Sequence, residues 1–138
     1  AIGIVPLQIC NYIHTETGLK ARWNGIHGQA NLLSKMKEMI NNNFPIIWSL
    51  YSFRKSISLY SYDQKNAVYQ ASTKINSHYV NVISIIETPS VSEHAIMLEV
   101  SSWGKQYFID FNEYLAYVGN SPISKYASNI VTVSSNNT

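Results

Sequence analysis

Three runs rich in β-branched and aromatic residues dominate the second half of the chain and predict an antiparallel meander. The runs are Tyr79 to Ile86, Ala95 to Val100 and Tyr107 to Phe111, and each has the composition and length of an ordinary strand. A long polar connection joins the first two runs, and a short one, Trp103 to Gln106, joins the last two. Because consecutive strands usually pair, we expect two hairpins that share the middle strand.

The first half of the chain carries helical periodicity instead. Between Ala30 and Asn42 the apolar residues recur every three or four positions and form one stripe, which predicts a helix packed on a core. The shorter stretch Val5 to His14 has the same spacing and predicts a second helix. Pro45 prevents the longer helix from continuing, and Ile46 to Ser52 is apolar enough to be a central strand.

Weaker patterns fill the rest of the chain. Residues 56–62 alternate serine with apolar residues and predict an edge strand, whereas Asp63 to Asn76 is polar and shows no clear pattern. Residues 19–29 are expected to be irregular. After the third run, Asn112 to Tyr117 predicts one or two helical turns capped by Asn112, and Ser128 to Ser134 alternates like a strand that returns to the sheet.

This order of patterns predicts an α+β fold. We expect a single domain over residues 1–138, with a helical part at 1–43 and a sheet part at 44–138. A chain of 138 residues is long enough to bury one sizeable core. It starts without a methionine, and we expect it to be the C-terminal portion of a longer domain.

Composition narrows the classes of function. Charged residues make up only 13% of the chain and the net charge is +2 without a basic cluster, which gives no reason to expect a nucleic-acid partner. No apolar run approaches the roughly 20 residues that span a bilayer. The tyrosine-, serine- and asparagine-rich surface favours an extracellular or cell-surface protein. The single cysteine excludes an intrachain disulfide and a cysteine-rich metal site.

The first hairpin of the meander brings one histidine toward a serine. Folding the chain about the connection Glu87 to His94 places Ser101 or Ser102 opposite His78. An imidazole held by a polar neighbour is the base-and-orienter half of a nucleophilic site. The alternative is that His78 only caps a strand.

The order of these motifs resembles a known family. A histidine that opens a strand, a next strand ending in Ser-Ser-Trp-Gly and a following aromatic strand are similar to the C-terminal half of papain-like cysteine peptidases. The resemblance is strongest to the bacterial branch that processes bacteriocin leaders, the double-glycine peptidases. Phe44 to Trp48 is similar to the family's Pro-Val-Ile strand, so that the resemblance covers residues 32–118.

The resemblance implies a papain-like fold, in which helices pack on a twisted antiparallel sheet or half-barrel. It also implies that Asp63 to Asn76 loops over the cleft. It implies a peptide or protein substrate and no cofactor. His78 takes the position of the general base, Ser101 that of the orienter and Trp103 that of the shielding tryptophan. Ser101 replaces the family's asparagine or aspartate, and it carries neither an amide nor a charge.

The family's nucleophile motif, a glutamine followed by Cys-Gly, is missing from the chain. Cys10 lacks the following glycine and lies on the apolar face of its predicted helix, so we interpret it as a buried core residue. The nucleophile is then expected on an upstream segment or an associated chain. The alternative hypothesis is a papain-like fold that has lost catalysis and binds a partner or a cell-wall ligand.

The other histidines offer two further readings. His94 rivals His78 as the base because it also precedes an apolar strand, but it lies seven residues before Ser101, about 23 Å away along a straight strand. A metal site would need ligands among the four histidines, and these show no paired spacing. We therefore expect no metal. The histidines are His14, His27, His78 and His94.

Overall fold

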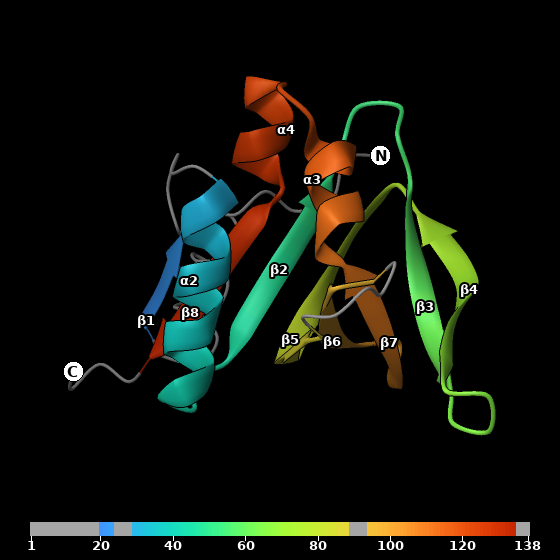
Figure 1. Cartoon of the computed structure of the whole chain (residues 1–138). Helices are drawn as coiled ribbons and strands as arrows, with labels where there is room; N and C mark the ends of the chain where they lie inside the picture. The colour runs from blue at the N-terminus through green and yellow to red at the C-terminus, as the bar shows by residue number, and fades with distance from the viewer. Residues whose placement is uncertain (1–19, 24–28, 89–93, 135–138) are drawn as a thin grey trace.

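Figure 1 shows the computed structural model of the chain. The structure describes residues 20–23, 29–88 and 94–134. The elements are β1 (Lys20–Trp23), α2 (Gln29–Asn41), β2 (Ile46–Tyr51), β3 (Ile57–Asp63), β4 (Val68–Ile75), β5 (Ser77–Glu87), β6 (Ile96–Ser102), β7 (Lys105–Asp110), α3 (Phe111–Val118), α4 (Pro122–Ala127) and β8 (Asn129–Ser134). The predicted α+β class is confirmed, and the expected meander is β5, β6 and β7.

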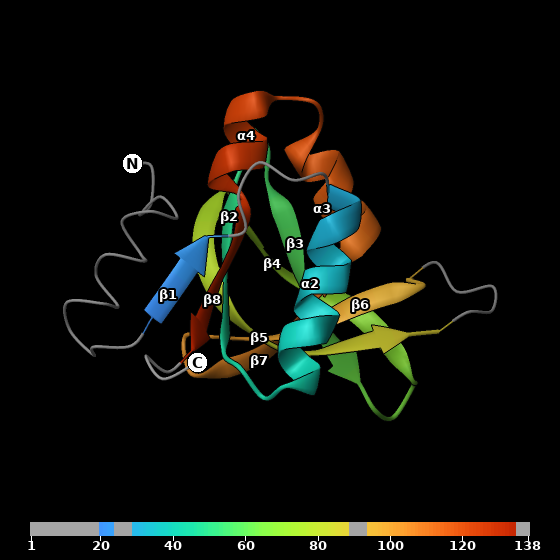
Figure 2. The same cartoon turned by 90° about the vertical axis from the view of Figure 1, so that its left-hand side faces the viewer.

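The strands of the described residues form one antiparallel sheet. Their order is β1-β8-β2-β5-β6-β7-β3-β4. In Figure 2, β2 and β8 run steeply while β5 and β7 lie across them, so the sheet is strongly twisted. The predicted return of the last strand is confirmed, because β8 pairs with β2 on one side and with β1 on the other.

Helix α2 supplies the helical side of the core. Leu32 and Met36 of its apolar stripe are buried, and Leu33, Met39 and Ile40 pack against the same cluster. The helix contacts β2, β5 and β8. The apolar spacing therefore predicted both the helix and the face that it buries.

The segment after β3, Asp63 to Asn76, was expected to loop over a cleft. Most of it is a strand instead, so this expectation was wrong. Val68–Ile75 forms β4 and pairs along its length with β3. Strand β3 also pairs with β7, so β4 and not β3 lies at the edge of the sheet. An edge strand that is exposed on both faces has no apolar alternation, and β4 is exposed at most positions.

Two local expectations also differ from the structure, and one short helix was not predicted. Asp110 rather than Asn112 caps α3. The unpredicted helix is α4, which begins at Pro122 with Ser121 as its N-cap. Lys20–Trp23 was expected to be irregular and forms β1, a strand that pairs with β8. The helix predicted at Val5 to His14 lies outside the described residues.

In the part of the chain that the structure describes, no helix has the length and apolar character needed to cross a membrane.

Candidate functional site

Two histidine clusters lie at opposite ends of the β6–β7 hairpin. His78 meets the end where Ser102 pairs with Lys105, and His94 meets the end where Met97 pairs with Asp110. The partners of the two histidines also lie on opposite faces of the sheet, because side chains alternate along a strand. Ser102 lies on the same face as the core residues Leu98 and Val100 of β6. Asp110 lies on the face opposite to the core residues Tyr107 and Ile109 of β7.

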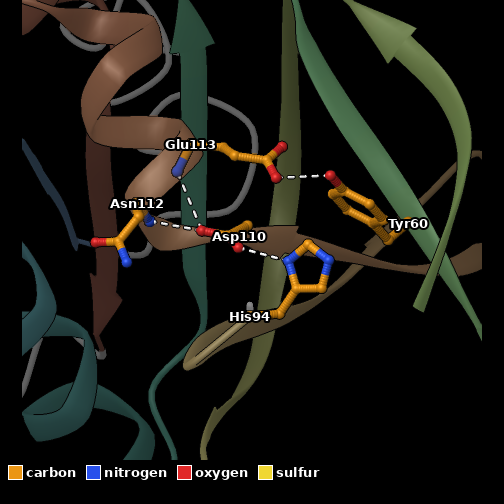
Figure 3. A network of polar contacts seen from close by, with 5 residues as sticks. All are labelled: Tyr60, His94, Asp110, Asn112 and Glu113. Atoms are coloured by element: carbon orange, nitrogen blue, oxygen red, sulfur yellow. Dashed lines mark hydrogen bonds and ion pairs between the residues drawn. The ribbon is translucent and has the colours of Figure 1, made fainter. Parts of the chain in front are cut away.

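The His94 cluster is built around one buried carboxylate (Figure 3). Asp110 is only 3% exposed, and its Oδ2 lies 2.6 Å from Nδ1 of His94. Its other oxygen, Oδ1, accepts hydrogen bonds from the backbone N–H groups of Asn112 (2.8 Å) and Glu113 (3.1 Å). One side chain therefore caps helix α3 and holds the imidazole at the same time.

The local sequence explains this placement. Asp110 ends β7 in an extended conformation and is directly followed by α3, so its carboxylate reaches the first free N–H groups of the helix. His94 stands two residues before β6. Since β6 and β7 are antiparallel, the start of the first and the end of the second meet at one end of the sheet.

Aromatic residues surround the His94 imidazole. The ring centre of His94 lies 4.9 Å from that of Tyr60 and 5.8 Å from that of Tyr69, and the Tyr69 ring is nearly perpendicular to the imidazole. Tyr60 donates its hydroxyl hydrogen to Oε2 of Glu113 at 2.6 Å. Burial, with the hydrogen bond to Glu113, raises the pKa of Tyr60 above its usual value, so the hydroxyl remains a donor at neutral pH.

An open depression of about 690 Å³ adjoins the His94 imidazole. Its walls are largely aromatic and apolar, and they come from β3, β4, β5 and β7. Besides His94 itself, the lining includes Tyr62, Tyr69, Ile86 and Phe108. A depression of this size can hold part of a ligand beside the imidazole.

The His78 cluster differs from the sequence prediction by one residue. Nε2 of His78 lies 2.5 Å from the hydroxyl oxygen of Ser102, whereas Ser101 pairs with Asn81 across the two strands. A shift of one position along a strand moves a side chain to the other face, and the sequence could not choose between the two serines. The Trp103 ring stacks on His78 with 4.4 Å between ring centres.

The electrostatic settings of the two imidazoles are different. Burial lowers the pKa of His78, and its hydrogen-bond partner is an uncharged hydroxyl. His94 instead faces the carboxylate of Asp110. Only the second arrangement places a negative charge where it can stabilise an imidazolium.

A metal ion could also be held by the His94 cluster. One ligand atom each from His94, Asp110 and Glu113 lies within 4.8 Å of the others. Within the described structure, Asp110 already accepts from two backbone N–H groups and contacts His94, while Glu113 accepts from Tyr60. These contacts supply hydrogen bonds to both carboxylates without an ion. Cys10, His14 and His27 lie outside the described residues.

Sequence reasoning missed Asp110, although a signal for it was present. A histidine just before one strand and an aspartate at the end of the next will meet when the two strands form a hairpin, and an aspartate followed by a helical pattern is a common cap.

No protein-family model matches this chain, and neither a curated protein nor a solved structure was found to match it. Function is therefore inferred from the side chains themselves.

Proposed function

We propose that this chain belongs to a papain-like cysteine hydrolase that acts on peptides or proteins at the cell surface or outside the cell, with His94 as the general base and Asp110 as its orienter. The observation that supports it most is the 2.6 Å contact between Nδ1 of His94 and the buried carboxylate of Asp110. The α+β arrangement agrees with the fold that the resemblance to that superfamily implies.

The proposed chemistry follows from this contact. A hydrogen on Nδ1 that points to Asp110 places the basic lone pair on Nε2. That nitrogen accepts the proton of a cysteine thiol, and the thiolate attacks the carbonyl carbon of a peptide bond. The imidazolium then gives the proton to the leaving amine, and water hydrolyses the thioester to release the acid and restore the thiol. The Asp110 charge stabilises the imidazolium throughout.

His94 suits this role better than His78 for two physical reasons. The hydroxyl of Ser102 cannot offset the positive charge that forms on His78. Burial also lowers the pKa of His78, so this imidazole is a weaker base than an ordinary histidine. We therefore assign the base to His94 in place of the sequence hypothesis of His78 with Ser101.

The nucleophile must come from elsewhere in the protein. None of the described residues is a cysteine, because Cys10 is the only one in the chain. The two possible sources are Cys10 itself and a cysteine on an upstream segment or associated chain. Cys10→Ser distinguishes them: loss of turnover assigns Cys10, and unchanged turnover assigns the other source.

The test measures cleavage of a labelled, unfolded protein and of a peptide library by the full-length protein. We expect His94→Ala to abolish cleavage and His78→Ala to leave most of it, with both variants folded by circular dichroism. A thiol-blocking reagent should stop the reaction and a metal chelator should not. Loss of activity on chelation would replace this proposal by a metal site at His94, Asp110 and Glu113.

The alternative, a catalytically inactive binding module, predicts a different experimental result. If the full-length protein cleaves nothing and no electrophilic thiol probe labels it, the hydrolase proposal fails. The binding-module hypothesis would then stand.

A further inference from the structure

The turn between β6 and β7 contains an unusual residue for its backbone conformation. Trp103 and Gly104 both have positive φ, +51° and +70°, and they form the two-residue connection of the hairpin. Such turns favour Asn-Gly, because asparagine and glycine adopt positive φ at less cost than other residues do. A bulky aromatic residue in this region is an outlier that points to a role other than folding.

Burial does not compensate for this strain. Trp103 is 60% exposed. One face of its indole stacks on His78, at 4.4 Å and 26° between rings, and the ring of Tyr79 lies nearly parallel to His78 at 5.9 Å and 19°. Tyr79 is also 47% exposed. The three rings form an aromatic row that is open to solvent.

The row borders an open depression of about 440 Å³. Its other lining residues include the polar residues Asn81, Ser101 and Ser102, and the Ser102 hydroxyl is bonded to His78. No lining residue carries a charge at neutral pH, because the pKa of the one histidine, His78, is lowered by burial. A charged ligand, such as a phosphate or an acidic peptide, would find no counter-charge among these side chains.

We propose that this Trp103 site, defined as His78, Tyr79, Asn81, Ser101 and Trp103, binds a neutral carbohydrate. A pyranose ring has an apolar C–H face that packs on an aromatic ring, and hydroxyls around its edge that bond to amides and hydroxyls. Asn81 offers both a donor and an acceptor, and Ser101 offers a hydroxyl. Pockets of roughly 300–1,000 Å³ hold small ligands, so the depression has room for a mono- or disaccharide.

An aromatic side chain of a peptide fits this site less well. It would use the aromatic row, but it would leave the amide of Asn81 and the hydroxyl of Ser101 against apolar surface without hydrogen bonds. The site is at the other end of the β6–β7 hairpin from His94. Its function therefore does not depend on the proposed hydrolase activity.

The experiment titrates the protein with neutral mono- and disaccharides, including glucose, galactose, N-acetylglucosamine and β-linked dimers, and follows binding by calorimetry. The key variant is Trp103→Asn, which removes the ring and suits the turn, so that it folds at least as well as the parent. We expect saturable binding by the parent and binding roughly tenfold weaker in this variant. Asn81→Ala should weaken binding as well.

Phe53→Ala is the matched control, because Phe53 is an exposed aromatic residue (64%) that does not line this depression. It should bind the sugar as the parent does. The proposal is overturned if no saccharide binds in the millimolar range, if Trp103→Asn binds as well as the parent, or if an aromatic peptide binds at the site and no sugar does. His94→Ala should bind sugar normally even where it abolishes cleavage, so the two proposals fail independently.

Discussion

Asp110 holds His94 and the start of helix α3 with the same carboxylate. Its Oδ2 contacts Nδ1 of the imidazole at 2.6 Å, and its Oδ1 accepts from two N–H groups of the first helical turn. Because the side chain is almost fully buried, these contacts fix its position. The orientation of the proposed base is therefore coupled to the stability of the helix.

Replacing Asp110 should separate the two roles. Asparagine is an equally good helix cap, so Asp110→Asn should retain most of the stability, whereas Asp110→Ala should lose about 1–2 kcal/mol of the free energy of unfolding. Neither asparagine nor alanine carries the negative charge that stabilises the imidazolium. Both variants should therefore lose roughly 10²- to 10⁴-fold in turnover. Urea unfolding and the cleavage assay measure the two effects.

A matched change at the next residue but one provides the control for Asp110. The side chain of Asn112 takes no part in the capping bonds, since only its backbone N–H does. Asn112→Ala should therefore leave both stability and turnover close to those of the parent. Equal turnover in Asp110→Asn and the parent would contradict the assignment of Asp110 as orienter.

Tyr60→Phe removes one hydroxyl and keeps the ring beside His94. The hydroxyl donates to Glu113 in a part-buried position, and a hydrogen bond to a charged group contributes about 1.5–3 kcal/mol when buried. We expect a loss of about 1 kcal/mol in the free energy of unfolding, measured in urea, because this pair is only part-buried. Tyr62→Phe, at an exposed position of the same strand, should change stability little. A Tyr60→Phe variant as stable as the parent would count against the bond.

Trp103→Asn should stabilise the protein. A left-handed conformation costs an ordinary L-residue about 1–2 kcal/mol, and asparagine tolerates it better than tryptophan. Loss of the stacking on His78 offsets part of this gain. We therefore expect a net increase of about 0.5–1 kcal/mol in thermal or urea unfolding. A marked loss of stability would show that the indole is a structural residue and weaken the case for a binding site.

His78 should make the protein less stable in mild acid. Burial lowers the pKa of His78 in the folded state, while in the unfolded chain it is about 6.5. Below that pH the unfolded state binds the proton more readily, so stability is full above pH 6.5 and is lost as the pH falls toward the lowered folded value. Urea unfolding at pH 7.5 and pH 5 measures the loss.

The His78→Gln variant tests the origin of that loss. It should show a smaller drop in stability between the two pH values than the parent does, because glutamine does not titrate. His94→Gln serves as the comparison at the other histidine cluster. If the parent and His78→Gln lose the same stability on acidification, the imidazole of His78 is not the group responsible.

The sequence by itself determined the order and type of the main elements. The apolar stripe of α2 and the β-branched runs of β5, β6 and β7 are local signals, since each element must present its own apolar face to the core. The edge strand β4 has no such signal because most of its side chains face solvent. Its existence depends on backbone pairing with β3, which is a tertiary contact.

Tertiary structure alone decided which side chains meet at the candidate site. The sequence predicted that a serine lies near His78, but the strand register determines that it is Ser102 and not Ser101. The sequence also places His94 before one strand and Asp110 at the end of another, yet their contact depends on how the β6–β7 hairpin meets helix α3. Register and hairpin geometry are set by the whole core, and a one-residue change in either moves a side chain to the other face of the sheet.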